Sequence, residues 1–125
     1  MRKRILIVED ISDLRTILRT EVQSLGYETF LAGNGKEAVA MASDELPDLI
    51  MMDVMMPEMD GLEAATLIRN NPKTSSIPIL GVTVLNRHKD IKKFFESGFS
   101  DYINKPFTPS QLDARIKKLL EPSEA

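Results

Sequence analysis

Short apolar runs alternate five times with segments of helical periodicity, and this alternation constrains the fold more than any other feature of the 125-residue sequence. Apolar residues dominate most of the runs, which are shorter than helices, so each run predicts a buried strand. The predicted strands are Ile5–Val8, Tyr27–Ala32, Leu49–Met52, Ile79–Val84 and Asp101–Ile103. A strand–helix repeat of this kind predicts an α/β fold: a five-stranded parallel sheet with helices on both faces, joined by right-handed crossovers.

The first helical segment follows Glu9 and Asp10. Ser12 is predicted to cap it, and Gly26 is predicted to end it. Its apolar residues recur at helical spacing and predict one stripe facing the core, made of Leu14, Ile17, Leu18, Val22 and Leu25.

Four further helices are predicted. Asn34 and Glu37 resemble a capping box for a helix that runs through Ala42 and stops before Pro47. Helices are also expected over 62–69 and 90–97, the second with Ile91, Phe94 and Phe95 on one face and Gly98 as its stop. The last helix begins with the capping box Thr108-Pro109-Ser110-Gln111 and is predicted to bury Leu112, Ile116, Leu119 and Leu120.

Composition limits the class of protein. The length suits one domain, expected over residues 1–121, with 122–125 as a disordered tail or the start of a linker. The net charge of −3 argues against direct nucleic-acid binding, and the apolar runs are too short for a membrane span or a secretory signal. The absence of cysteine excludes thiol chemistry and suits a cytoplasmic location.

Polar side chains stand at the carboxyl ends of several predicted strands. The first strand leads into Glu9 and Asp10, the third into Asp53, the fourth carries Thr83, and the fifth is followed by Lys105. In a parallel α/β sheet these ends border the ligand-binding crevice. We therefore expect three carboxylates, a hydroxyl and an ammonium group to meet there.

Three neighbouring carboxylates repel one another, and Lys105 supplies only one balancing charge. Oxygen ligands without Cys or His favour Mg²⁺, with Mn²⁺ as a possible substitute. Asp53 is then the candidate nucleophile toward phosphorus, and Asp10 and Asp53 are the candidate metal ligands. Lys105 and Thr83 are expected to contact phosphoryl oxygens.

With these motifs in place, the sequence resembles the receiver domain of two-component response regulators. The resemblance rests on Ile5-Leu6-Ile7-Val8-Glu9-Asp10, Asp53-Val54-Met55-Met56-Pro57-Glu58-Met59-Asp60-Gly61, Val82-Thr83 and Lys105-Pro106-Phe107. It implies the flavodoxin-like (βα)5 receiver fold and phosphotransfer onto Asp53 from a sensor histidine kinase or a histidine phosphotransfer protein. It also implies Glu9 as an indirect metal contact, the backbone carbonyl of Met55 as a metal ligand, and Thr83 with Tyr102 as a switch pair.

The resemblance extends to partners. It implies that the first helix contacts the kinase through Arg15, Arg19 and Gln23, with Phe107 and Pro109 nearby. An output protein of unknown identity would contact the surface of the fourth helix, fifth strand and last helix, where Lys92, Lys93, Lys117 and Lys118 are candidates. The start Met1-Arg2-Lys3-Arg4 favours a free-standing receiver, similar to chemotaxis regulators, over an excised domain.

Two residues, Val84 and Met55, are expected to affect the rates at which the acyl phosphate forms and is hydrolysed. Val84 follows the switch threonine where a small residue is common in the family, so it is expected to narrow access to the acyl phosphate. Met55 stands where aspartate-dependent phosphatases carry a second acid, so slow autodephosphorylation, not enzymatic turnover, is expected. The alternatives are a phosphorylation-independent interaction module and a Mg²⁺-dependent phosphohydrolase. Tyr102 remains open as a rotamer switch or as static packing.

Overall fold

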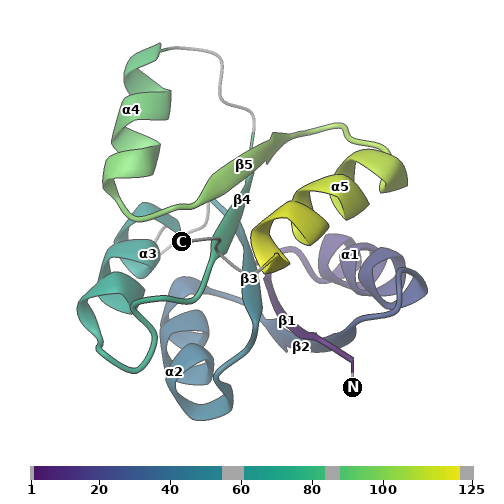
Figure 1. Ribbon diagram of the computed structural model, residues 1–125, viewed down its shortest axis with the longest axis horizontal. Coiled ribbons are helices and arrows are strands. Elements are labelled where there is room, and N and C mark those ends of the chain that lie inside the picture. Colours follow the sequence, from purple (N-terminus) through teal and green to yellow (C-terminus); the bar gives the residue numbers. More distant parts are fainter. Residues whose placement is uncertain (1, 55–60, 84–87, 122–125) are drawn as a thin grey trace.

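The computed structural model describes residues 2–54, 61–83 and 88–121, with 88–91 described by backbone alone. Within these ranges strands and helices alternate along the chain (Figure 1). The strands are β1 (Arg4–Val8), β2 (Glu28–Ala32), β3 (Leu49–Asp53), β4 (Ile79–Thr83) and β5 (Asp101–Asn104). The helices are α1 (Ser12–Ser24), α2 (Gly35–Glu45), α3 (Gly61–Asn70), α4 (His88–Glu96) and α5 (Pro109–Leu120).

The five strands form one parallel sheet in the order β2-β1-β3-β4-β5, which confirms the predicted fold class. The chain moves from β1 outward to β2, then crosses back to β3 on the other side of β1. The strand order therefore reverses between β1 and β3. In sheets of this class the crevice that holds a ligand opens at such a reversal, beyond the carboxyl ends of the strands.

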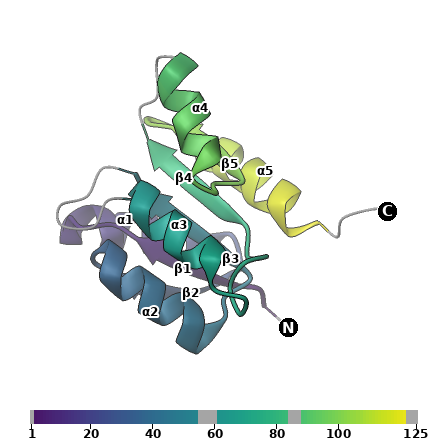
Figure 2. The ribbon, with the colours of Figure 1, turned by 90° about the vertical axis from the view of Figure 1, so that its left-hand side faces the viewer.

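Alternating side chains of the buried strands divide the core into two layers. In β1, Ile5 and Ile7 pack with the apolar side chains of α1 and α5, whereas Leu6 and Val8 pack with those of α2 and α3. Successive strand residues point to opposite faces, so a strand covered on both sides must be apolar throughout. Figures 1 and 2 show α1 and α5 on one face and α2 and α3 on the other.

Helix α1 differs from the sequence prediction in two respects. The residue that caps it is Ile11, which makes no side-chain cap hydrogen bond, and Ser12 is the first helical residue. The predicted core stripe is wrong at its first half, because Leu14 and Ile17 are 38% and 53% exposed. These two side chains line a surface groove shared with the segment after β5, and only the second half of the helix packs closely on the sheet.

The remaining helix signals are largely confirmed. Asn34 accepts a hydrogen bond from the backbone N–H of Glu37, and α2 continues to Glu45, beyond the predicted end. Thr108 caps α5 with both hydrogen bonds of the capping box. Gly98 has a φ of +112° after α4, as a helix stop requires. On α5, Leu112 and Ile116 are buried as predicted, whereas Leu119 and Leu120 are only half-buried against the same core. On α4, Phe94 is buried and Phe95 is exposed.

No helix in the described part of the chain is both long enough and apolar enough to cross a bilayer.

Candidate phosphoryl-acceptor site

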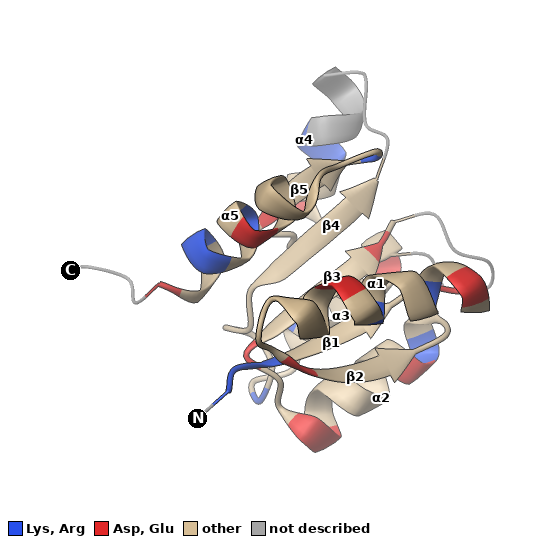
Figure 3. Cartoon of the chain, turned by 90° about the vertical axis from the view of Figure 1, so that its right-hand side faces the viewer, with Lys and Arg blue, Asp and Glu red and all other residues tan. Residues whose placement is uncertain are grey.

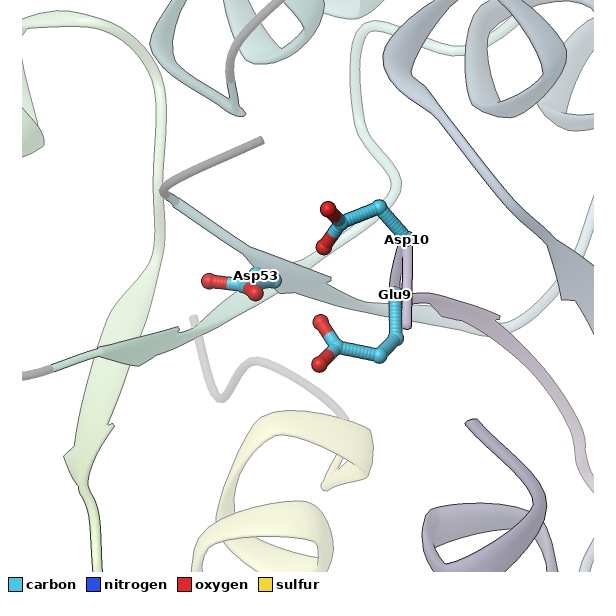
Figure 4. Close-up of side chains that lie close together, drawn as sticks. All are labelled: Glu9, Asp10 and Asp53. Atoms are coloured by element: carbon cyan, nitrogen blue, oxygen red, sulfur yellow. The ribbon is translucent and has the colours of Figure 1, made fainter. Parts of the chain in front are cut away.

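The carboxyl ends of β1 and β3 bring three acids together. Glu9 and Asp10 follow β1 directly, and Asp53 is the last residue of β3. One carboxylate oxygen from each lies within 4.8 Å of the others. Figure 4 shows the side chains of Glu9 and Asp10 leaving the end of β1 toward Asp53. The convergence predicted from the sequence is thus present for these residues.

Glu9 and Asp53 are the buried members of this acidic cluster, and Glu9 is the more deeply buried of the two. It is 1% exposed, and neither carboxyl oxygen meets a hydrogen-bond donor among the residues that the structure describes. Burial, together with the neighbouring carboxyl groups of Asp53 and Asp10, raises the pKa of Glu9 to about 8, while Lys105 acts in the opposite direction. A charged carboxylate here therefore needs an additional positive partner.

Two further strands contribute the remaining polar groups. Nζ of Lys105, just beyond β5, lies 3.9 Å from Oδ2 of Asp53. The backbone N–H of Lys105 donates to the carbonyl of Thr83 at 3.0 Å, which extends the β4–β5 ladder to the site. Thr83 is buried at the end of β4, one residue beyond Val82, the register partner of Asp53. The Lys105–Pro106 peptide bond is cis.

Tyr102 belongs to an aromatic cluster between β5 and α4. It pairs with Gly81 in the β4–β5 ladder, and its ring meets Phe94 and Phe95 edge-on, with centroid separations of 5.7 and 6.0 Å. Tyr102 is half-buried. The predicted switch residue is therefore in contact with α4, while its role stays a prediction.

The predictions for Met55 and Val84 fall outside the described residues, as does the tail 122–125.

Arg15 has a contact that the sequence did not suggest. The resemblance placed it on a docking surface, yet its Nη1 donates to the backbone carbonyl of Glu9 at 2.8 Å, and the side chain is half-buried. The only sequence signal for a specific role of Arg15 was its position near the start of a helix, where the helix dipole disfavours a positive charge.

A groove of about 320 Å³ opens beside the acidic cluster. Its apolar wall comes from α1 and from the segment after β5, and Glu9 and Lys105 line it as well. The complete lining is Glu9, Leu14, Ile17, Leu18, Glu21, Lys105, Pro106 and Phe107. An apolar surface thus leads directly to the polar site.

The donor set of the cluster fits a hard divalent cation. Its potential ligands are carboxylate oxygens, and the buried oxygens of Glu9, which meet no hydrogen-bond donor among the described residues, indicate a shortage of positive charge. Mg²⁺ and Mn²⁺ bind such sites, whereas Zn²⁺ prefers nitrogen and sulfur ligands. Together with Lys105, the site is suited to binding a group with several negative oxygens beside the carboxylate of Asp53.

Comparison with known proteins places these features in context. The family model for the response regulator receiver domain matches residues 5–117. The chain is 38% identical over 124 residues to the alkaline phosphatase synthesis transcriptional regulatory protein PhoP of Bacillus subtilis, covering 99% of this chain and 51% of PhoP. It is 39% identical over 119 residues to the response regulator PleD of Caulobacter vibrioides, covering 95% of this chain and 26% of PleD. The chain therefore spans about half the length of PhoP and a smaller part of PleD.

Solved structures agree with the fold. The chemotaxis protein CheY4 of Vibrio cholerae superposes with a TM-score of 0.90 at 29% identity, covering 96% of this chain and 100% of CheY4. The receiver domain of the sensor histidine kinase PA1611 of Pseudomonas aeruginosa gives 0.89 at 30% identity, covering 96% of this chain and 98% of that one. The PA1611 structure holds a magnesium ion coordinated in its active-site cleft.

Proposed function

This chain belongs to the response regulator receiver family, and from that premise we propose that Asp53 accepts a phosphoryl group from a phosphohistidine donor. The donor is a sensor histidine kinase or a histidine phosphotransfer protein. The observation that supports the proposal most directly is the convergence of Glu9, Asp10 and Asp53 within 4.8 Å, with Lys105 beside Asp53. The phosphorylated domain acts as a signalling switch toward an output protein.

In the transfer step, a carboxylate oxygen of Asp53 attacks phosphorus. An O–P bond forms, the N–P bond to the donor imidazole breaks, and the imidazole takes the bonding electrons. The ammonium of Lys105 binds a phosphoryl oxygen, and the hydroxyl of Thr83 donates to another. The transition state carries most of its charge on these oxygens, so catalysis consists of positioning and charge neutralisation.

The metal would be held by carboxylate oxygens of Asp10 and Asp53 and by the backbone carbonyl of Met55, with Glu9 contributing indirectly. When bound, Mg²⁺ neutralises charge on the phosphoryl oxygens. The negative charges of Glu9 and Asp10 attract a divalent cation to this position and balance its positive charge.

The apolar groove beside the site is a suitable surface for the phosphodonor. The exposed side chains of Leu14 and Ile17 on α1 line this groove together with Phe107, and exposed Ile11 lies just before the helix. A helix of the donor packed there would bring its phosphohistidine to Lys105 and the acidic cluster. Arg19 and Gln23 remain candidates for the polar rim of that contact.

The response to phosphorylation would involve Thr83, Tyr102 and α4. Acyl phosphate formation adds roughly one negative charge and new acceptor oxygens beside Thr83 and Lys105. Tyr102 already contacts Phe94 and Phe95, so movement of its ring changes the packing of α4. A nearly complete switch requires phosphorylation to favour the active state by roughly 5 kcal/mol. Figure 3 shows the basic segment of α5, where Lys117 and Lys118 are output-contact candidates.

The first test is the intact mass of the protein after incubation with acetyl phosphate and Mg²⁺. We expect one added phosphoryl group, which disappears in Asp53→Asn and when the metal is chelated. Asp13→Asn is the matched control, because Asp13 is an exposed acid on α1 outside the cluster, and it should still be labelled. Labelling that survives in Asp53→Asn would contradict the assignment of the acceptor.

A second test separates the switch from a phosphorylation-independent interaction module. An output protein captured by this chain should bind the phosphorylated form more tightly than Asp53→Asn. Equal affinity for both forms would refute the switch and favour the module. Repeated hydrolysis of a small phosphoester would instead support a phosphohydrolase.

A further inference from the structure

The guanidinium of Arg15 reaches back from α1 to the backbone that carries the acidic pair. Its Nη1 donates to the carbonyl oxygen of Glu9 at 2.8 Å. The backbone N–H of Glu9 donates to the carbonyl of Ala32 at 3.1 Å. Both polar backbone groups of Glu9 are therefore held, one by the β2 end of the sheet and the other by Arg15.

The bond from Arg15 has a consequence for two acids at once. The carbonyl of Glu9 and the N–H of Asp10 belong to the same planar peptide group. A hydrogen bond that fixes this carbonyl also fixes the peptide plane, which contains the Cα atoms of both Glu9 and Asp10. The carboxylates of Glu9 and Asp10 point toward Asp53 from that plane (Figure 4).

The loop after β2 leaves space for this guanidinium. A Cβ on Gly33 would lie 3.1 Å from Nη1 of Arg15 and 3.5 Å from Oε1 of Glu37. The backbone N–H of Gly33 donates to Oε2 of Glu37 at 3.3 Å, which ties the loop to α2. The guanidinium of Arg15 thus packs against Gly33, where a side chain would crowd it.

We propose that Arg15 is a positioning residue of the phosphoryl-acceptor site, which acts by holding the Glu9–Asp10 peptide so that both carboxylates face Asp53. This inference rests on the proposed Mg²⁺-dependent function. In this role Arg15 would act through the backbone of Glu9 and would not itself be a ligand of the metal. Residues that orient metal ligands from behind affect metal affinity by about 10–100-fold.

The experiment measures Mg²⁺ affinity by isothermal titration calorimetry for the wild type and three variants. Arg15→Met replaces the aliphatic part of the arginine side chain with one of similar length but removes the guanidinium donor. We expect Mg²⁺ binding to weaken by about tenfold or more. Arg15→Lys keeps one donor and should recover part of the loss. Lys36→Met removes an exposed positive charge from the neighbouring start of α2 and should leave the affinity unchanged.

Gly33→Ala provides an independent variant, since it crowds the guanidinium without altering its chemistry. The added Cβ would move Nη1 of Arg15 by only a few tenths of an ångström, so we expect Mg²⁺ binding to weaken less than in Arg15→Met. Circular dichroism of the metal-free proteins verifies that each variant is folded. Unchanged Mg²⁺ affinity in Arg15→Met would overturn the positioning role while leaving the proposed function intact. A wild type that binds no Mg²⁺ would overturn both.

Discussion

Gly81, at the middle of β4, faces the ring of Phe94 from α4, and this contact makes Gly81→Ala an informative perturbation. A Cβ at position 81 would lie 2.4 and 2.5 Å from Cε1 and Cζ of Phe94 and 3.0 Å from Cδ1 of Phe99. Carbon atoms in contact normally lie about 3.5–4.0 Å apart, so the Phe94 ring must retreat by about 1 Å. That ring is 1% exposed and stacks on Phe99 at 4.1 Å, which leaves little room for the movement.

The magnitude follows from two opposing effects. Overpacking a buried site costs about 1–3 kcal/mol, whereas replacing glycine by alanine reduces the freedom of the unfolded chain by about 0.4–1 kcal/mol. We expect Gly81→Ala to lower the free energy of unfolding by about 1–2 kcal/mol. Urea unfolding followed by far-UV circular dichroism measures this value, and the method suits a chain without tryptophan.

A double-mutant cycle assigns the cost to the ring. Phe94→Leu removes the ring atoms nearest to position 81, so Gly81→Ala should cost at least about 1 kcal/mol less in that background. Gly26→Ala is the matched control, because Gly26 has a φ of +100° and no atom of the described residues lies within 4 Å of the added Cβ. Its cost comes from backbone strain and should be equal in both backgrounds. A Gly81→Ala protein as stable as the wild type would refute the packing argument, as would an equal cost with and without the Phe94 ring.

Three further predictions concern the acidic cluster, the bonds from Arg69 of α3 to the segments before β4 and β5, and the last helix. The pKa of Glu9 is about 8 in the folded, metal-free protein against 4.5 for an unperturbed carboxyl, so the folded state binds an extra proton between these pH values. The contribution of Glu9 to the free energy of unfolding is fully present below pH 4.5 and is lost as the pH rises toward 8, so stability should fall by up to about 5 kcal/mol over this range in urea titrations without Mg²⁺. Glu9→Gln should remove most of this slope. Arg69 donates to three backbone carbonyls and one hydroxyl. Arg69→Leu should therefore lower the free energy of unfolding by about 2–3 kcal/mol. Arg2→Leu, at an exposed position, is the control and should leave the free energy of unfolding nearly unchanged. Thr108→Ala removes the cap of α5 and should cost about 1 kcal/mol in the same assay, more than Thr20→Ala on the exposed side of α1.

Each of these has a contrary result. A flat pH dependence in the metal-free wild type would show that Glu9 ionises normally. An Arg69→Leu protein of wild-type stability would show that water replaces the guanidinium at those carbonyls. Equal effects at the two threonines would show that the capping box contributes no more than an exposed helical position.

Local patterns along the chain were sufficient for the elements and for the acidic cluster. Five apolar runs separated by helical segments permit few folds other than a parallel sheet covered on both faces. The convergence of Asp10 and Asp53 followed from the same topology, because residues that end neighbouring parallel strands lie at one edge of the sheet. The α5 cap was also readable, since its hydrogen bonds join residues three positions apart.

Contacts between distant segments were decided only by the tertiary structure. Apolar periodicity on α1 did not reveal that Leu14 and Ile17 line a groove, because exposure depends on where the segment after β5 lies. The sequence likewise did not pair Gly81 with Phe94, or Arg15 with the carbonyl of Glu9. The physical reason is that spacing along the chain determines which face a residue occupies, whereas the packing of other elements determines what that face meets.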